Sequence, residues 1–211
     1  RLALGTSIFL LVIGFVSFFY FEQDSTLREH STMYGKSVTA FFGAVTPRTA
    51  GFNTVNMTSL TLPCIMIYLL LMWIGASPGS TGGGIKTTTI AVAILNMVSI
   101  VRGKDRTEFH RTQISEPSIN RAFAIILLSL FIIGCSVFLI SFNDSDKGLM
   151  EIAFESFSAF STVGLSLGIT SGLSAMSKLV LVLVMFIGRV GALTIIVAFV
   201  NQSRQLYYRY P

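Results

Sequence analysis

Long apolar segments alternate with short polar loops along this chain. Charge-free runs occupy Leu2–Phe21, Leu60–Ile85 and Ala122–Asn143, and a further run from Leu179 to Gln202 holds a single charge, Arg189. About 20 apolar residues are enough for a helix to cross a bilayer. The pattern therefore predicts an all-α membrane protein that crosses the bilayer several times.

Composition supports this class, because 52% of the 211 residues are hydrophobic and only 12% are charged, against about 25% charged in soluble domains. The net charge of +5 does not indicate a nucleic acid partner. With the loops placed alternately on the two sides of the bilayer, the basic residues concentrate on the inner side, as the positive-inside rule expects. The expected partner of this surface is the lipid bilayer.

The chain contains an internal repeat with an offset of 113 positions. Thr49-Ala50-Gly51-Phe52 corresponds to Thr162-Val163-Gly164-Leu165, and Ile74-Gly75 corresponds to Ile187-Gly188. A repeat indicates one structural unit written twice. The predicted unit is a helix–pore loop–helix (M1-P-M2) arrangement. Residues 1–101 form the first unit, 102–118 a cytoplasmic linker, 119–203 the second unit and 204–211 a cytoplasmic tail.

Each unit contains a short apolar segment ahead of its Thr-x-Gly sequence, at Gly35–Thr46 and Leu149–Phe160. Both segments are too short to cross a bilayer as helix, so they are expected to be re-entrant half-helices. Pro47 suits a chain that stops being helical there. Irregular backbone at membrane depth is tolerated only inside protein or beside water, so the residues that follow should line an aqueous path.

A Thr-x-Gly turn in that position can bind a cation. Rings of backbone carbonyls replace the water shell of an ion, and glycine permits the positive φ that such a turn needs. Thr162-Val163-Gly164 matches the start of the Thr-Val-Gly-Tyr-Gly potassium filter; the simpler alternative is a turn after a core helix. The predicted filter is Thr49, Ala50, Gly51, Phe52, Thr162, Val163, Gly164 and Leu165, with K⁺ at the carbonyls of Thr49, Ala50, Gly51, Thr162, Val163 and Gly164.

The apolar segment from Leu60 to Val101 is too long for one span and is interrupted by glycine and proline. A segment in which glycine and proline cluster this closely does not remain helical. Two helices joined by a flexible loop are therefore predicted. A loop at this place, below the first Thr-x-Gly turn, is a candidate gate. It comprises Gly75, Ala76, Ser77, Pro78, Gly79, Ser80, Thr81, Gly82, Gly83 and Gly84.

Two cations accompany this loop. Lys86 makes Gly79–Thr87 resemble a phosphate-binding loop, but Ile85 separates Gly84 from the lysine and breaks the required register; contact with loop carbonyls and snorkelling to the inner surface remain open. Arg189 lies within an apolar segment, where a charge is expensive and by default functional. It is predicted to face the pore, either as an electrostatic barrier or as a clamp on the loop.

Four motifs resemble the Trk/Ktr/HKT superfamily of potassium transporters, and most of all the bacterial Ktr membrane subunit. They are Thr46–Phe52, Gly75–Thr89, Ser161–Ser166 and Ile187–Thr194. The family has four repeats around one pore, and the two here resemble the third and fourth. We therefore expect a fragment, or the ordered half of a longer subunit, whose first two repeats are missing.

The resemblance implies potassium uptake, often sodium-dependent, by a homodimer in the bacterial plasma membrane. It also implies a cytoplasmic regulatory ring that binds nucleotide and moves loop 75–84, with no covalent cofactor on this chain. Gly51 and Gly164 would be filter glycines, and Arg189 would reach under the filter. The alternative is a secondary transporter that binds a small organic substrate at the broken helix. No enzyme is predicted, because no histidine lies in the membrane segments and no buried carboxylate pair is expected.

Overall fold

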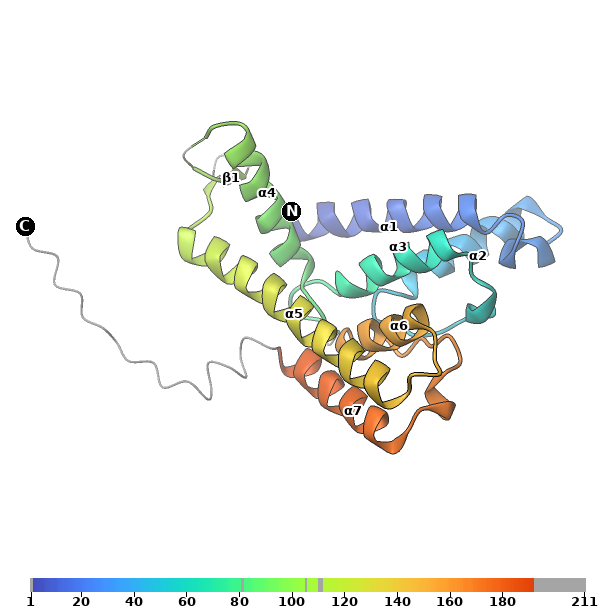
Figure 1. The fold of residues 1–211 in the computed structure, drawn as a ribbon. Helices are drawn as coiled ribbons and strands as arrows, with labels where there is room; N and C mark the ends of the chain where they lie inside the picture. The colour runs from blue at the N-terminus through green and yellow to red at the C-terminus, as the bar shows by residue number, and fades with distance from the viewer. Residues whose placement is uncertain (1, 81, 105, 110–111, 192–211) are drawn as a thin grey trace, which may run out of the picture.

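The computed structural model describes residues 2–80, 82–104, 106–109 and 112–191, which form packed helices and one short hairpin (Figure 1). Thr81 of the predicted gate, the predicted end of the second unit at 192–203 and the tail at 204–211 lie outside the described residues. The helices are α1 (Leu2–Phe21), η1 (Thr26–Glu29), α2 (Met33–Val45), η2 (Met57–Ser59), α3 (Leu62–Trp73), α4 (Thr87–Val101), α5 (Glu116–Asn143), α6 (Leu149–Phe160), η3 (Thr170–Gly172) and α7 (Ala175–Val190), and the strands are β1 (Glu108–Phe109) and β2 (Thr112–Gln113).

Two of the described helices, α1 with 20 residues and α5 with 28, are long and apolar enough to cross a membrane. Helices α3 and α4 are apolar but shorter, with 12 and 15 residues, because the chain leaves the helical conformation between Trp73 and Thr87. Large apolar side chains on α1, such as Phe9, and on α5, such as Phe131, are exposed. An apolar surface of this kind suits a lipid environment.

The helices form two groups of three that occupy matching places in the two halves of the chain. α1 packs on α2 and α3, while α5, α6 and α7 pack on one another, and α3 contacts α6 to join the groups (Figure 1). The short helices predicted at 35–46 and 149–160 are α2 and α6. The hairpin of β1 and β2 lies between α4 and α5 and was not predicted from the sequence.

An acidic residue after the first helix of each group holds the start of the third helix. Glu22 Oε1 accepts hydrogen bonds from the Thr61 amide and hydroxyl, both at 2.8 Å. Asp144 accepts from the Ser174 amide at 3.1 Å and the Ser174 hydroxyl at 2.9 Å. The first amides of a helix lack intrahelical partners and favour negative charge. Thr61 and Ser174 are themselves 113 positions apart, so this arrangement follows the sequence repeat.

Helix α7 starts earlier than its apolar run at Leu179 suggested, because Ser174 caps it and its Oγ accepts from the Ser177 amide at 3.3 Å. Its described part ends at Val190, and Gly191 follows with a φ of 92°. Gly188 allows α7 to approach the end of α6 closely, because a Cβ at this position would lie 1.8 Å from the Phe160 carbonyl oxygen. This contact fixes α7 beside the turn that follows α6.

Candidate ion-conduction site

The two Thr-x-Gly sequences have the same unusual backbone. Thr49 and Gly51 have φ values of 69° and 72°, and Thr162 and Gly164 have φ values of 52° and 93°. Among the described residues, these two threonines are the non-glycine positions with positive φ. A β-branched residue in that region is strained, and such strain gathers at functional sites. Alternation between positive and negative φ directs successive carbonyls to the same side of the chain.

The turns of the two units lie against each other. A Cβ on Gly51 would be 2.0 Å from the carbonyl oxygen of Val163 and 3.8 Å from the Cα of Gly164. No side chain fits between them at this point. The sequence repeat therefore brings its two Thr-x-Gly segments together in space, with the Val163 carbonyl at their contact.

Each turn is fastened to the end of its own short helix. After α6, the Thr162 amide donates to the Ala159 carbonyl at 3.0 Å and the Val163 amide to the Ser158 carbonyl at 2.9 Å. After α2, the amides of Ala50 and Gly51 both donate to the Thr46 carbonyl at 3.1 Å. The carboxyl ends of α2 and α6 thus precede the turns directly, and the negative end of a helix dipole favours a cation.

The glycine-rich loop packs directly on both turns. The Gly83 amide donates to Thr162 Oγ1 at 2.9 Å, and a Cβ on Gly82 would be 2.9 Å from Thr49 Oγ1. Below these contacts, the Ile85 amide donates to the Trp73 carbonyl at 3.2 Å. The loop therefore closes on itself, and Gly75, Gly82 and Gly83 lie where a Cβ would be closer than 3.0 Å to a neighbouring atom.

A polar chain also joins the first turn to this loop through α1. Arg48 donates from Nη1 to the Ser7 carbonyl at 3.0 Å and from Nη2 to Ser7 Oγ at 3.2 Å. Ser7 Oγ lies 3.0 Å from Ser77 Oγ. The sequence analysis did not identify Arg48. Its charge, next to Pro47 in an otherwise apolar segment, could have indicated a functional position.

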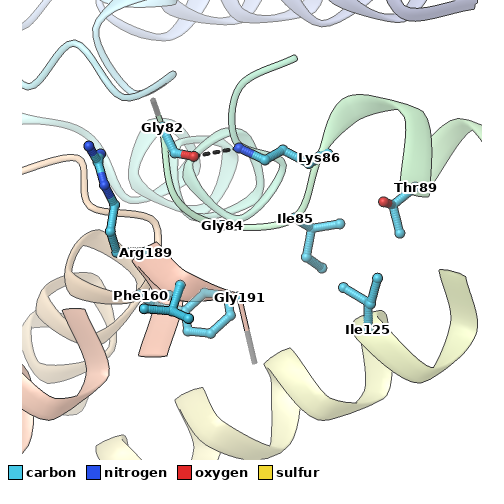
Figure 2. A pocket seen from close by; sticks show the side chains of 11 residues that line it. Gly82, Gly84, Ile85, Lys86, Thr89, Ile125, Phe160, Arg189 and Gly191 are labelled. Carbon is cyan, nitrogen blue, oxygen red and sulfur yellow. Dashed lines mark hydrogen bonds between the residues drawn. The ribbon is translucent and has the colours of Figure 1, made fainter. Parts of the chain in front are cut away.

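Lys86 and Arg189 line one cavity of about 260 Å³ with Gly82, Gly84 and Gly191. The Lys86 ammonium donates to the Gly82 carbonyl at 2.5 Å, which is the loop contact left open by the sequence. Figure 2 shows Arg189 extending from α7 towards the side of the cavity where Gly82 lies. Helix α3, rather than a strand, precedes the loop, so the phosphate-loop interpretation of Lys86 has no structural support.

Two further residues beside the turns were missed. Tyr68 of α3 donates its hydroxyl to the Gly43 carbonyl of α2 at 2.7 Å. Glu155 of α6 accepts from the hydroxyls of Ser166 and Thr170, which follow the second turn. Both contacts join residues from different elements, so spacing along the chain gave no sign of them.

Comparisons with known proteins show which family the chain resembles. A family model described as "TrkH: Cation transport protein" matches residues 5–207. The chain is 38% identical over 213 residues to Ktr system potassium uptake protein B of Bacillus subtilis, covering 100% of this chain and 47% of that protein. It is 32% identical over 216 residues to the potassium/sodium uptake protein NtpJ of Enterococcus hirae, covering 100% of this chain and 48% of that protein.

The fold is similar to the crystal structure of the potassium transporter TrkH from Vibrio parahaemolyticus, with a TM-score of 0.77 at 18% identity, over 95% of this chain and 44% of that one. The chain spans about half the length of each of these relatives. The family match covers nearly the whole sequence, and the paired turns lie inside it. The chain therefore belongs to the TrkH family of cation transport proteins.

Proposed function

We propose that this chain forms two repeats of a membrane subunit that takes up K⁺ through a pore. One observation carries the proposal. Two strained Thr-x-Gly turns, each at the carboxyl end of a short helix, lie in contact with each other. Backbone carbonyls in such an arrangement can replace the hydration shell of K⁺, and relatives that match the whole chain are named as potassium uptake proteins.

The rest of the pore follows from the length of the relatives. Because the chain spans about half of each one, two further repeats of the same subunit would complete a four-repeat filter. The subunit would work as a homodimer in the bacterial plasma membrane, with a nucleotide-binding ring on its cytoplasmic side. The name of NtpJ as a potassium/sodium protein supports a role for Na⁺ beside K⁺ in this family.

In this proposal the ion binds at the carbonyls of residues 49–51 and 162–164, and loop 75–84 is the gate beneath it. The buried Gly82 packs against the Thr49 side chain, and the buried Gly83 donates its amide to the Thr162 hydroxyl, so the loop lies where it can obstruct the ion path. Relatives that match the whole chain are named as potassium or potassium/sodium uptake proteins, which is why we do not favour the secondary-transporter alternative.

The filter is tested by measuring K⁺ uptake and the K⁺/Na⁺ permeability ratio of the intact subunit after Gly51→Ser or Gly164→Ser. Both residues need positive φ, so a side chain at either should lower selectivity or stop uptake. Gly134→Ser on α5 is the matched control, because a Cβ there meets nothing within 4 Å. Unchanged selectivity in both filter variants would count against the proposal.

The gate is tested by removing residues 78–80, the exposed tip of the loop, or by Arg189→Ala. Either change should raise K⁺ flux in the closed condition if the loop and the arginine obstruct the path. Lower flux from a normally assembled protein would instead show that they support the filter from below.

A further inference from the structure

The outer end of the second turn is held by a buried carboxylate that belongs to the short helix behind it. Glu155 lies on α6 and is only 6% exposed. Its Oε1 accepts from the hydroxyl of Ser166 and, at 2.8 Å, from the hydroxyl of Thr170. A buried carboxylate is costly unless hydrogen bonds compensate it. A carboxylate that is buried and hydrogen-bonded to the segment after the turn therefore indicates a role at this site.

The carboxylate acts together with a serine on the same face of α6. Ser158 lies one turn later, and its Oγ accepts from the Gly164 amide at 3.2 Å. The Gly168 amide donates to Ser166 Oγ at 2.8 Å. The segment is thus fastened to α6 by side chains at the filter glycine and again just beyond the turn.

The hydrogen-bond roles of the two hydroxyls follow if Glu155 is ionised. Each hydroxyl carries one proton, and an ionised carboxylate only accepts. Both hydroxyl protons then point at Glu155. Ser166 Oγ and Thr170 Oγ1 lie 2.8 Å apart because both donate to the same carboxylate oxygen. Hydrogen bonds to a charged acceptor are roughly twice as strong as neutral ones, so an ionised Glu155 would hold this segment more tightly than a neutral side chain.

The first turn is held differently. Phe42 stands at the position that corresponds to Glu155, and the Thr46 hydroxyl donates to the Phe52 carbonyl instead. The repeat therefore preserves the turn but not the side chains that brace it. In the described part of the chain, a carboxylate contacts the segment after the second turn, whereas a threonine hydroxyl braces the first turn.

We propose that Glu155 is a positioning residue for ion selection, which holds the carbonyls of the second turn at the spacing that K⁺ requires. This inference rests on the proposed potassium pore. Glu155 does not touch the ion; it acts through Ser166 and Thr170, so that the segment after Gly164 cannot relax towards the smaller Na⁺.

The test compares the K⁺/Na⁺ permeability ratio and the K⁺ flux of the intact subunit in Glu155→Gln, Ser166→Ala and the double variant. Losing one hydrogen bond to a charged group corresponds to a factor of about ten in an equilibrium constant. Ser166→Ala deletes the hydroxyl that donates to Glu155, and Glu155→Gln replaces the charged acceptor by a neutral amide oxygen, so we expect each single change to lower the ratio by about tenfold. The double variant should lose less than the sum of the two, because both changes affect the hydrogen bond between Glu155 and Ser166. Glu151→Gln, one turn earlier on α6, removes the same charge as a control and should leave the ratio unchanged.

Normal selectivity in an assembled Glu155→Gln protein, or additive losses in the double variant, would overturn the inference. If Glu155→Gln does not assemble, Thr170→Val decides together with Ser166→Ala, because both delete a hydroxyl that donates to Glu155, whereas only the Ser166 hydroxyl also accepts from the Gly168 amide. A purely structural role would lower the amount of assembled protein without moving the ratio. Failure of the proposed pore is distinguishable, since the unaltered protein would then show no selective K⁺ flux.

Discussion

Replacing Tyr68 by phenylalanine removes one hydroxyl from the core and leaves a specific carbonyl without a partner. The Gly43 carbonyl, near the end of α2, would ordinarily accept from the amide four residues later. That residue is Pro47, which has no N–H. The Tyr68 hydroxyl takes its place at 2.7 Å, and its side chain is only 1% exposed. A buried polar group left unpaired costs about 1–3 kcal/mol, so Tyr68→Phe should destabilise the protein by that amount.

The assay is unfolding of the purified protein in detergent, run as a double-mutant cycle with Pro47→Ala. The second change restores an amide that can bond Gly43, so Tyr68→Phe should cost much less in that background. Tyr20→Phe is the control, because Tyr20 is 72% exposed and should lose almost nothing. An equal cost of Tyr68→Phe in both backgrounds, or no cost at all, would refute the reasoning.

Two further predictions concern α7. Gly188→Ala places a Cβ 1.8 Å from a main-chain oxygen of α6, so overpacking should destabilise the protein by about 1–3 kcal/mol. Gly134→Ala is the control and should be neutral or stabilising, because a Cβ there meets nothing within 4 Å. Equal shifts in the unfolding temperature of the two variants would contradict this. Hydrogen bonds from Ser177 and Ser174 hold the pKa of Asp144 below its usual value. A carboxyl group whose pKa is lower in the folded state stabilises the folded protein at every pH above its unfolded-state pKa of about 3.9. This stabilising free energy is lost as the pH falls through the folded-state pKa. Asp144→Asn should therefore flatten the pH dependence of unfolding below about pH 5, and an unchanged profile would contradict it.

The turns and their helices could be predicted because each feature is local. A short apolar segment, a following Thr-x-Gly sequence and a second copy at a fixed offset are all readable from the chain. The positive φ of Gly51 and Gly164 follows from residue type. The break between α3 and α4 is equally local, because glycine and proline stop a helix wherever they cluster.

What holds the turns in place could not be predicted, because it depends on contacts between distant residues. Arg48 reaches Ser7, which is 41 positions away in the sequence, and Tyr68 reaches Gly43, 25 positions away. The contacts of Glu155 could not be predicted from the chain, because Ser166 and Thr170 lie 11 and 15 positions further on and its counterpart Phe42 is apolar. Such pairings appear only when the helices have been placed beside one another.

The most direct measurement is bound-ion density in the intact subunit, determined once in K⁺ and once in Na⁺. The proposed pore predicts density for K⁺ among the carbonyls of residues 49–51 and 162–164, and weaker or displaced density in Na⁺. Turns that carry no ion in K⁺, or that face lipid rather than a central aqueous path, would contradict it.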